Sequence, residues 1–291
     1  MIDIASVAEM RAWSRAQRST GRRVGFVPTM GYLHEGHLRL LDRARALSDA
    51  TVVSIFVNPL QFGPSEDLDR YPRDLPRDRS LAHDRGADCL FVPAVAEMYA
   101  EPALVRVTPG PLADHLCGVR RPGHFEGVLT VVAKLFHIVE PDVAVFGRKD
   151  AQQARVIRRM VSDLNWPVEI AVAPTTREPD GLAMSSRNAY LQPADRERAA
   201  RIPAALRAAH AAFVEGETSA QAICDAVRAP LAADPGIDVE YVEAVDPDTL
   251  SPVAAVDDKT LLAVAARVGS TRLIDNIVMG EGFELDTFLA P

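Results

Sequence analysis

The chain has 291 residues, of which 48% are hydrophobic and 25% are charged. These values are close to those of soluble globular domains, so they exclude a disordered chain, and the length predicts about two domains. No apolar run approaches the roughly 20 residues that a membrane-spanning helix needs. The formal net charge of -8 opposes non-specific attraction to nucleic acids and anionic lipids, so we expect neither a nucleic acid nor a membrane as partner.

The N-terminal segment and the cysteines indicate the cellular compartment. Residues 1–10 contain neither a basic segment nor a continuous apolar stretch, so no secretory signal is visible and we expect a cytoplasmic protein. Cys89, Cys117 and Cys224 stand far apart without a CxxC pair, which indicates neither a zinc site nor a disulfide framework. We expect three reduced thiols without a role.

The first part of the chain alternates short apolar runs with helical stretches. Residues 24–27, 51–57 and 89–92 are rich in β-branched and aromatic residues, as is typical of strands buried on both faces. Residues 37–47 and 74–86 lie between these runs and have the length of helices. The alternation predicts right-handed βαβ units around a parallel sheet.

The alternation continues beyond a less regular stretch, in which we expect an extra strand at residues 104–108. The further predicted elements are an apolar helix at 125–139, a strand at 143–147, an amphipathic helix with outward arginines at 150–164, and a strand at 168–174. Together they predict one α/β domain, a doubly wound parallel sheet, over residues 1–175.

The pattern changes after Thr175 or Thr176, where we place the domain boundary. A polar loop to residue 188 precedes Ala-rich helices at 193–213 and 218–232. Apolar residues then alternate around 237–245 and 261–268. We expect a second, smaller α+β domain over residues 176–291.

Two histidines follow the strand at residues 24–27, close to the start of the next helix. In a doubly wound sheet, the free backbone N–H groups and the helix dipole favour a phosphate at this turn. His34 and His37 can donate hydrogen bonds to phosphoryl oxygens as charge develops on them, which favours phosphoryl or nucleotidyl transfer. The alternatives are a pair of solvated side chains, or a metal site for which no further ligand cluster is evident.

Asn58 and Gln61 follow the strand at residues 51–57, so we expect them at the same carboxyl edge of the sheet. Their amides can bind a hydroxyl and a carboxylate without adding charge. The alternative is an Asn-Pro turn followed by an exposed glutamine.

Lys149 and Asp150 follow the strand at residues 143–147 in the same way. The lysine can neutralise triphosphate charge, and the carboxylate can hold Mg²⁺ directly or through water. The alternative is a surface ion pair.

The loop at residues 177–188 contains Ser185, Ser186 and Arg187 near the predicted boundary. Two hydroxyls and a guanidinium on a mobile loop with a glycine can close over phosphates and exclude water. The alternative is a serine-rich linker, but residues 182–184 are apolar for a tether.

These segments resemble the pantothenate synthetase family, the pantoate:β-alanine ligases of the nucleotidyltransferase superfamily, related in fold to class I aminoacyl-tRNA synthetases. The tetrapeptide from His34 to His37, HEGH, is similar to the HIGH signature of that superfamily, and the MSSR tetrapeptide that ends at Arg187 is similar in place to its KMSKS loop. The resemblance extends over the whole chain through the segments 28–31, 58–63, 121–125, 147–153 and 271–276.

The resemblance implies a Rossmann-like fold of the nucleotidyltransferase type, a homodimer, and a reaction in two steps. ATP and (R)-pantoate form a pantoyl adenylate and release pyrophosphate, and the amine of β-alanine then attacks the adenylate to give pantothenate and AMP. In-line attack on the α-phosphorus needs alignment and charge neutralisation more than a protein nucleophile, and this agrees with the many donors found in the sequence.

The resemblance also implies roles for individual residues. His37 is the expected proton donor, and His34, Lys149 and Arg187 complete the expected catalytic set. Gln61 and Gln153 are expected to hold pantoate, Asn58 to add a hydrogen bond, and Gln61 to border β-alanine as well. Mg²⁺ is expected to accompany ATP at Asp150, and a backbone contact to adenine is expected at Thr176. The expected ATP-binding residues are Met30, Gly31, Tyr32, Leu33, His34, Glu35, Gly36, His37, Gly147, Arg148, Lys149, Asp150, Thr176, Met184, Ser185, Ser186 and Arg187.

Arg148 and Ala151 depart from the family pattern, and they affect the expected shape of the pocket wall. Two other functions remain open at this point. An adenylyltransferase acting on a phosphorylated molecule would need further cations, whereas the amides of Gln61 and Gln153 suit an unphosphorylated hydroxy acid. A non-catalytic nucleotide-binding regulator would not need donors at so many positions that face phosphates.

Overall fold

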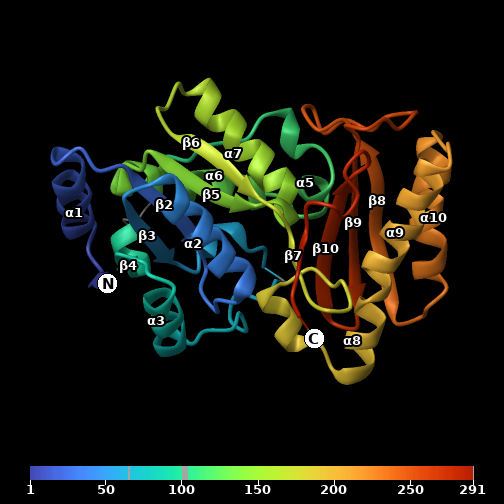
Figure 1. Cartoon of the computed structure of the whole chain (residues 1–291), viewed down its shortest axis with the longest axis horizontal. Helices are drawn as coiled ribbons and strands as arrows, with labels where there is room; N and C mark the ends of the chain where they lie inside the picture. Colours follow the sequence, from blue (N-terminus) through green and yellow to red (C-terminus); the bar gives the residue numbers. More distant parts are fainter. Residues whose placement is uncertain (65, 100–103, 291) are drawn as a thin grey trace. The chain divides into compact units, whose positions relative to one another are not determined.

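The computed structural model describes residues 1–64, 66–99 and 104–290, and it divides into two compact units (Figure 1). The first unit comprises Met1–Pro109, Arg121–Arg148 and Val156–Ala173, and the second comprises Gly110–Arg120, Lys149–Arg155 and the residues from 174 onward. Two short stretches that precede residue 175 in the sequence therefore pack with the C-terminal part. The division into domains at residues 175 and 176 stays a prediction.

The first unit is built on a six-stranded sheet with the order β1-β4-β3-β2-β5-β6, in which all pairs are parallel. The predicted doubly wound α/β sheet is thus confirmed. From β2 the chain builds outward through β3 and β4, and it then returns to the other side of β2 to add β5 and β6. The carboxyl ends of strands at such a reversal are where open α/β sheets bind ligands. The strands are β1 (Ile2–Ile4), β2 (Val24–Thr29), β3 (Ala50–Ile55), β4 (Cys89–Phe91), β5 (Val143–Gly147) and β6 (Glu169–Ala173).

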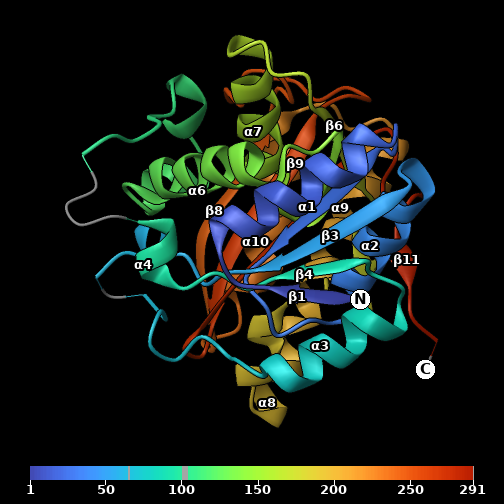
Figure 2. The ribbon, with the colours of Figure 1, turned by 90° about the vertical axis from the view of Figure 1, so that its left-hand side faces the viewer.

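Helices cover both faces of this sheet. Successive side chains of β2 point to opposite faces, so neighbouring residues of this strand contact different helices. Val27 packs in one cluster with Leu41 and Ala44 of α2 (Glu35–Leu47) and with Ala82 of α3 (Leu75–Asp84). Phe26 lies edge-on to Phe136 of α6 (His124–Val139), with ring centroids 6.4 Å apart. Figure 2 shows α6 beside α1 (Val7–Ser19). The short α4 (Val95–Met98) and the 3-10 helix η1 (Pro59–Gln61) complete the helices that lie wholly within this unit's described residues.

The expected strand at residues 104–108 was wrong, since the described chain forms no strand there. Leu104 and Val105 are 84% and 86% exposed, and apolar alternation cannot make a strand without a partner. The sequence analysis also missed β1 and α1. β1 has only three residues, and α1 is a polar helix whose clearest start signal is the Ser6 cap on the Glu9 amide.

The second unit is the expected smaller α+β part. Its antiparallel sheet has the order β10-β9-β8, with β8 (Ile237–Val245), β9 (Leu261–Val268) and β10 (Thr271–Val278). The helices α8 (Pro193–Ala199), α9 (Arg201–Val214) and α10 (Ala220–Ala232) belong to it, and core residues of all three pack with the sheet in one apolar cluster. The shorter elements are η2 (Pro111–Ala113), α5 (Cys117–Arg120), η4 (Ser186–Tyr190), and the strand pair β7 (Thr176–Arg177) and β11 (Thr287–Phe288).

The helix expected at residues 193–213 is two helices that separate at Ala200. Pro203 explains the break, because it has no N–H for a helical bond to the carbonyl of Ala199 but fits the first turn of a new helix. The helix expected at 150–164 is α7 (Ala151–Asp163), preceded by the 3-10 turn η3 (Arg148–Asp150). Among the helices in the described ranges, none has the length and apolar character needed to cross a membrane.

Candidate active site

The segment between β2 and α2 turns sharply through left-handed backbone. Gly31 has a φ of 83° and Tyr32 a φ of 51°, so the turn needs glycine at the first position and strains the second. The Gly31 amide donates to Thr29 Oγ1 at 3.2 Å. The loop is thus bent by its own residues before any ligand binds.

Asp78 holds this loop from α3, and the sequence analysis missed it. The amides of Tyr32 and Leu33 donate to Asp78 Oδ2 and Oδ1 at 2.7 and 2.6 Å. Arg77, one residue earlier, donates to the Leu33 carbonyl at 2.8 Å and lies over the Tyr32 ring. Asp78 is 1% exposed, and burial raises the pKa of its carboxyl against the lowering effect of the two amides. These amides are therefore already used within the protein, so an anion at this turn would rely on the helix start and the imidazoles.

The rings of the two histidines lie against each other at the start of α2, tilted by 35°. His34 is the N-cap, its ring centroid is 4.0 Å from that of His37, and its amide donates to His37 Nδ1 at 3.3 Å. Because Nδ1 accepts this bond, a neutral His37 ring carries its proton on Nε2. The backbone thereby selects the tautomer that presents an N–H donor at the far end of the ring.

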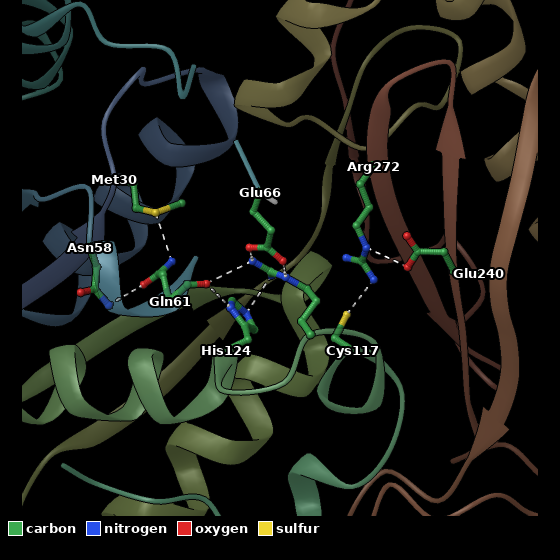
Figure 3. Close-up of polar contacts among 9 residues, drawn as sticks. Met30, Asn58, Gln61, Glu66, Cys117, His124, Glu240 and Arg272 are labelled. Carbon is green, nitrogen blue, oxygen red and sulfur yellow. Dashed lines mark hydrogen bonds and ion pairs between the residues drawn. The ribbon is translucent and has the colours of Figure 1, made fainter. Parts of the chain in front are cut away.

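Gln61 is fixed by its neighbours on both sides (Figure 3). Its Nε2 donates to Met30 Sδ at 3.1 Å, and its Oε1 accepts from Asn58 Nδ2 at 3.1 Å. Gln61, which is predicted to bind pantoate, therefore contacts Met30, the first residue of the segment predicted to bind ATP. This contact brings two separate sequence motifs together within one unit.

Asn58 supports Gln61 from a buried position. Its Nδ2 also donates to the Gly127 carbonyl at 3.0 Å, and its Oδ1 accepts from Tyr99 Oη at 2.7 Å. Asn58 is 1% exposed, so its amide is used inside the protein. The expected direct bond from Asn58 to pantoate stays a prediction, and these contacts favour a supporting role instead.

The main chain of Gln61 is held by a second group of side chains, also drawn in Figure 3. His124 Nδ1 and Arg121 donate to the Gln61 carbonyl at 2.9 and 3.3 Å. Arg121 also makes a bidentate pair with Glu66, with both distances 2.6 Å. Burial alone would raise the pKa of the Glu66 carboxyl, but Arg121, helped by the Gly63 amide and His124, outweighs burial and lowers it. The sequence analysis used Arg121 and His124 only as part of a motif.

Gly127 allows this arrangement. A Cβ at Gly127 would lie 2.2 Å from the Leu60 carbonyl oxygen, so only glycine lets α6 approach η1 this closely. No local sequence signal indicates this role. A single glycine in an apolar helix indicates only a lower helix propensity at that position.

In the second unit, Lys149 and Asp150 lie at the start of α7. Lys149 Nζ and Asp150 Oδ2 are 3.9 Å apart, with side chains 19% and 45% exposed, so their mutual attraction is weak. Gln152 fixes this helix start, because its Nε2 donates to the carbonyls of Leu112 and His115 and its Oε1 accepts from the Cys117 amide. Gln153, the expected pantoate ligand, is only half-buried.

The loop at residues 177–188 is folded as a small hairpin, which argues against a linker. The Met184 amide donates to the Thr176 carbonyl at 2.9 Å, and Arg177 forms a bridge with Ala183. Ser185 Oγ then accepts from the Arg187 amide at 3.2 Å and starts η4. The return arm of the hairpin therefore ends at Met184 and leads directly into Ser185, Ser186 and Arg187.

A buried arginine anchors this hairpin. Arg177 is 0% exposed and binds Asp275 through two nitrogens, at 2.7 and 3.0 Å, and Asp286 at 2.5 Å. It also donates to the Gly181 carbonyl at the tip of the turn. Burial alone would lower the pKa of Arg177, but the two carboxylates outweigh it and raise the pKa. The sequence analysis missed this role.

Comparison with known proteins decides the family. The profile described as pantoate-beta-alanine ligase matches residues 3–278. The chain belongs to the pantoate-beta-alanine ligase family. Pantothenate synthetase of Thermoanaerobacter sp. (strain X514) is 51% identical over 281 residues, which are 97% of this chain and 99% of that protein. Pantothenate synthetase of Thermotoga neapolitana is 53% identical over 277 residues, which are 95% of this chain and 99% of that protein.

Solved structures agree with this membership. A pantothenate synthetase structure from Thermus thermophilus has a TM-score of 0.91 and 48% identity, covering 96% of this chain and 99% of that one. A pantoate-beta-alanine ligase structure from Francisella tularensis, in complex with beta-gamma ATP and beta-alanine, has a TM-score of 0.79 and 31% identity, covering 96% and 98%. The chain is thus an enzyme, a ligase of pantothenate biosynthesis that joins pantoate to β-alanine.

The residues predicted to form the site fall into two sets, one in each unit. The first unit brings together Met30, Asn58 and Gln61 and sets the His34 and His37 rings against each other. The second unit holds Lys149, Asp150 and Gln153 at one helix start and the 184–187 segment on the hairpin.

The cysteines lie outside both sets. Cys89, Cys117 and Cys224 are buried free thiols, as expected, and burial raises the pKa of the Cys89 thiol to about 12. Cys117 accepts from Arg272, which also pairs with Glu240 at 2.8 Å (Figure 3).

Proposed function

We propose that the ligase works through an enzyme-bound pantoyl adenylate. A carboxylate oxygen of (R)-pantoate attacks the α-phosphorus of ATP, and the bond to pyrophosphate breaks. The amine of β-alanine then attacks the acyl carbon, and AMP leaves as pantothenate forms. The contact of Gln61 with Met30 carries this proposal, because it joins the residue proposed to bind pantoate to the first residue of the segment proposed to bind ATP.

The residues proposed to bind ATP are the segment from Met30 to His37, Gly147, Arg148, Lys149, Asp150, Thr176 and the segment from Met184 to Arg187. The Thr176 carbonyl already accepts a bond from Met184, so an adenine contact at Thr176 would have to share that carbonyl or use the Thr176 amide.

His37 is proposed to donate a hydrogen bond, or a proton, to the phosphate oxygens as charge develops. The bond from the His34 amide to His37 Nδ1 supports this role, since it leaves the proton on Nε2. Lys149 and Arg187 are proposed to neutralise the triphosphate. Preorganised donors of this kind lower the barrier because they need not reorient during the reaction.

Pantoate is proposed to bind Gln61 and Gln153, with β-alanine bordering Gln61. Asn58 is proposed to act mainly by fixing the Gln61 amide through its bond to Oε1. The side chains of Gln61 and Gln153 end in neutral amides, which can bind a hydroxyl and a carboxylate at once.

Mg²⁺ is proposed to arrive with ATP. Within the described residues, no three His, Cys, Asp or Glu side chains form a cluster that could hold a metal ion. Asp150 is a single carboxylate, 45% exposed, and Mg²⁺ commonly takes one or two carboxylates together with substrate phosphates and water. Asp150 therefore fits one ligand position, and the ion would supply neutralisation of phosphate charge there.

Two further expectations remain proposals. They are a homodimer, as the family resemblance implies, and action in the cytoplasm. Sedimentation equilibrium of the purified chain would test the dimer, and a monomer at micromolar concentration would contradict it.

The adenylate can be tested with isotopes. When the pantoate carboxylate is labelled with ¹⁸O, one labelled oxygen should appear in AMP, because the attacked phosphorus keeps the oxygen of the carboxylate. Unlabelled AMP would contradict the adenylate. AMP formation should also depend on both pantoate and β-alanine in steady state, which separates this function from a nucleotide-binding regulator.

A further inference from the structure

Asn276 contacts the backbone of Lys149 from a distant part of the sequence. Its Nδ2 donates to the Lys149 carbonyl oxygen at 2.8 Å, across 127 positions. Asn276 is 5% exposed, and it belongs to the 271–276 segment, whose role the reaction itself does not explain. The bond ties strand β10 to the residue whose ammonium is proposed to meet the triphosphate.

Asn276 is itself held firmly. β10 pairs with β9 along its whole length, with Asn276 opposite Ala263. The carboxylate of Asp275 accepts a hydrogen bond from the backbone N–H of Asn276 at 2.8 Å and also binds the buried Arg177. Because neighbouring side chains of a strand point to opposite faces, Asp275 and Asn276 anchor the strand on both sides.

The segment that carries Lys149 is fixed at two points. Gln152 holds the first turn of α7 through three hydrogen bonds to residues 112–117. Asn276 holds the turn before it, at Lys149 itself. Asn276 therefore adds a restraint at Lys149 itself to the one that Gln152 exerts from three residues away.

We propose that Asn276 is a positioning residue for adenylate formation, which sets the place of the Lys149 ammonium by holding the Lys149 carbonyl. The inference rests on the proposed role of Lys149 at the triphosphate. A lysine ammonium is a point charge on a flexible four-carbon stem, so its position depends on where its backbone is anchored. A displacement of about 1 Å in an active site can cost on the order of 100-fold in rate.

The first test replaces Asn276 by Ala and, to keep its volume, by Leu. Adenylate formation should slow about 10- to 100-fold in kcat, while KM for ATP changes less than about 3-fold, because the lost interaction acts on the transition state. Thr271→Val is the matched control, a buried polar residue of the same strand with no role in the site. It should leave the rate unchanged. A loss that follows a fall in the thermal midpoint of both Asn276 variants would overturn the inference.

The second test measures coupling in the full-length enzyme, in single turnovers with enzyme in excess. In a Lys149→Ala background, Asn276→Ala should slow adenylation by less than about 3-fold further, because its effect passes through the missing ammonium. Equal losses in both backgrounds would overturn the inference and leave the role of Lys149 intact. Normal adenylation by Lys149→Ala alone would overturn the proposed role of Lys149, and the inference with it.

Discussion

The proposed site residues of the first unit and those of the second are held in place by different kinds of interaction. In the first unit, Asp78 binds two consecutive loop amides, and the Gln61 amide and carbonyl are bound by Asn58 and His124. Most of these bonds join a neutral backbone or amide group to a side chain. In the second unit, the hairpin depends on the guanidinium of Arg177 between two buried carboxylates.

The difference predicts different consequences of mutation. Hydrogen bonds to neutral groups contribute about 1 kcal/mol each, so losing one in the first unit should alter the geometry of the site more than the stability of the fold. A buried ion pair that loses one partner leaves an uncompensated charge, which is strongly destabilising. We therefore expect the first set to be sensitive in rate and the second in stability.

The largest expected effect on stability is that of Arg177→Met. The change removes the buried guanidinium that binds both Asp275 and Asp286, whose side chains are 2% and 1% exposed. The free energy of unfolding should fall by about 3–5 kcal/mol in urea titrations. Arg196→Met is the matched control, since Arg196 pairs with two acids but is 28% exposed, and it should cost at most about 1 kcal/mol.

Neutralising the carboxylates should reverse part of this loss. In the Arg177→Met background, adding Asp275→Asn and Asp286→Asn should recover stability, because the buried charges are then removed. A single Arg177→Met variant as stable as the wild type would show that the hairpin does not depend on this ion pair.

The largest expected effect on rate is that of His37→Ala. Adenylation should slow by about 10²- to 10³-fold, or roughly 3–4 kcal/mol, because one preorganised donor is removed. The thermal midpoint should change by only a few degrees, since the hydrogen bond from the His34 amide to the His37 ring is long, at 3.3 Å. His83→Ala is the control, because the His83 side chain is 65% exposed, and it should change neither the adenylation rate nor the thermal midpoint.

A partial rescue would sharpen this result. His37→Gln keeps an N–H donor near the former Nε2 and should retain more activity than His37→Ala. If His37→Ala keeps the full rate, or loses it only by unfolding, the solvated or structural interpretation of this histidine is correct.

The sheet of the first unit and the residues at its strand ends could be predicted from the sequence for a physical reason. Strands buried on both faces must be uniformly apolar, so β2, β3 and β5 stand out, and polar residues directly after them are visible as exceptions. Motifs such as the one from His34 to His37 are local in sequence, and local patterns can be read without the fold.

The supporting residues could not be predicted in this way. Tyr32 and Asp78 are 46 positions apart, and Arg177 and Asp275 are 98 apart, so only the packing of distant elements reveals them. Gly127 is required because α6 approaches Leu60, which no local pattern encodes. The strand expected at 104–108 was wrong for the converse reason, because its local pattern has no partner in the sheet.

Asp78→Asn should have an effect of intermediate size, and it tests the hydrogen bonds that hold the loop of the first unit. One carboxylate oxygen becomes an NH₂ group that cannot accept the Tyr32 or Leu33 amide, so a buried donor is left unpaired at a cost of about 1–3 kcal/mol in unfolding free energy. The loop should relax, and adenylation should slow by about 10-fold, in line with the cost of a misplaced active-site group. Asp74→Asn is the same change in the same helix, and it should be nearly neutral because asparagine caps α3 as well as aspartate does. Equal effects of the two variants would contradict a special role for Asp78.

The smallest expected effect concerns pH and Glu66. The pKa of this carboxyl is lowered from its ordinary value of 4.5, because Arg121, with smaller contributions from the Gly63 amide and His124, outweighs burial. A lowered folded-state pKa contributes stability that is fully present above the unfolded-state pKa and is lost as the pH falls through the folded-state pKa. The contribution should therefore disappear on acidification below about 4.5, and it should not exceed about 1 kcal/mol because the pair is partly reached by solvent.

Glu66→Gln should flatten the pH dependence of the unfolding free energy in that acid range, as measured by urea titrations at a series of pH values. Arg121→Met should remove most of the same slope, because it removes the cation that lowers the pKa. If Glu66→Gln keeps the wild-type slope, the ion pair does not stabilise the fold. The Gln61 carbonyl would still be held by the His124 Nδ1 donor at 2.9 Å and by Arg121 at 3.3 Å, since neither bond involves Glu66.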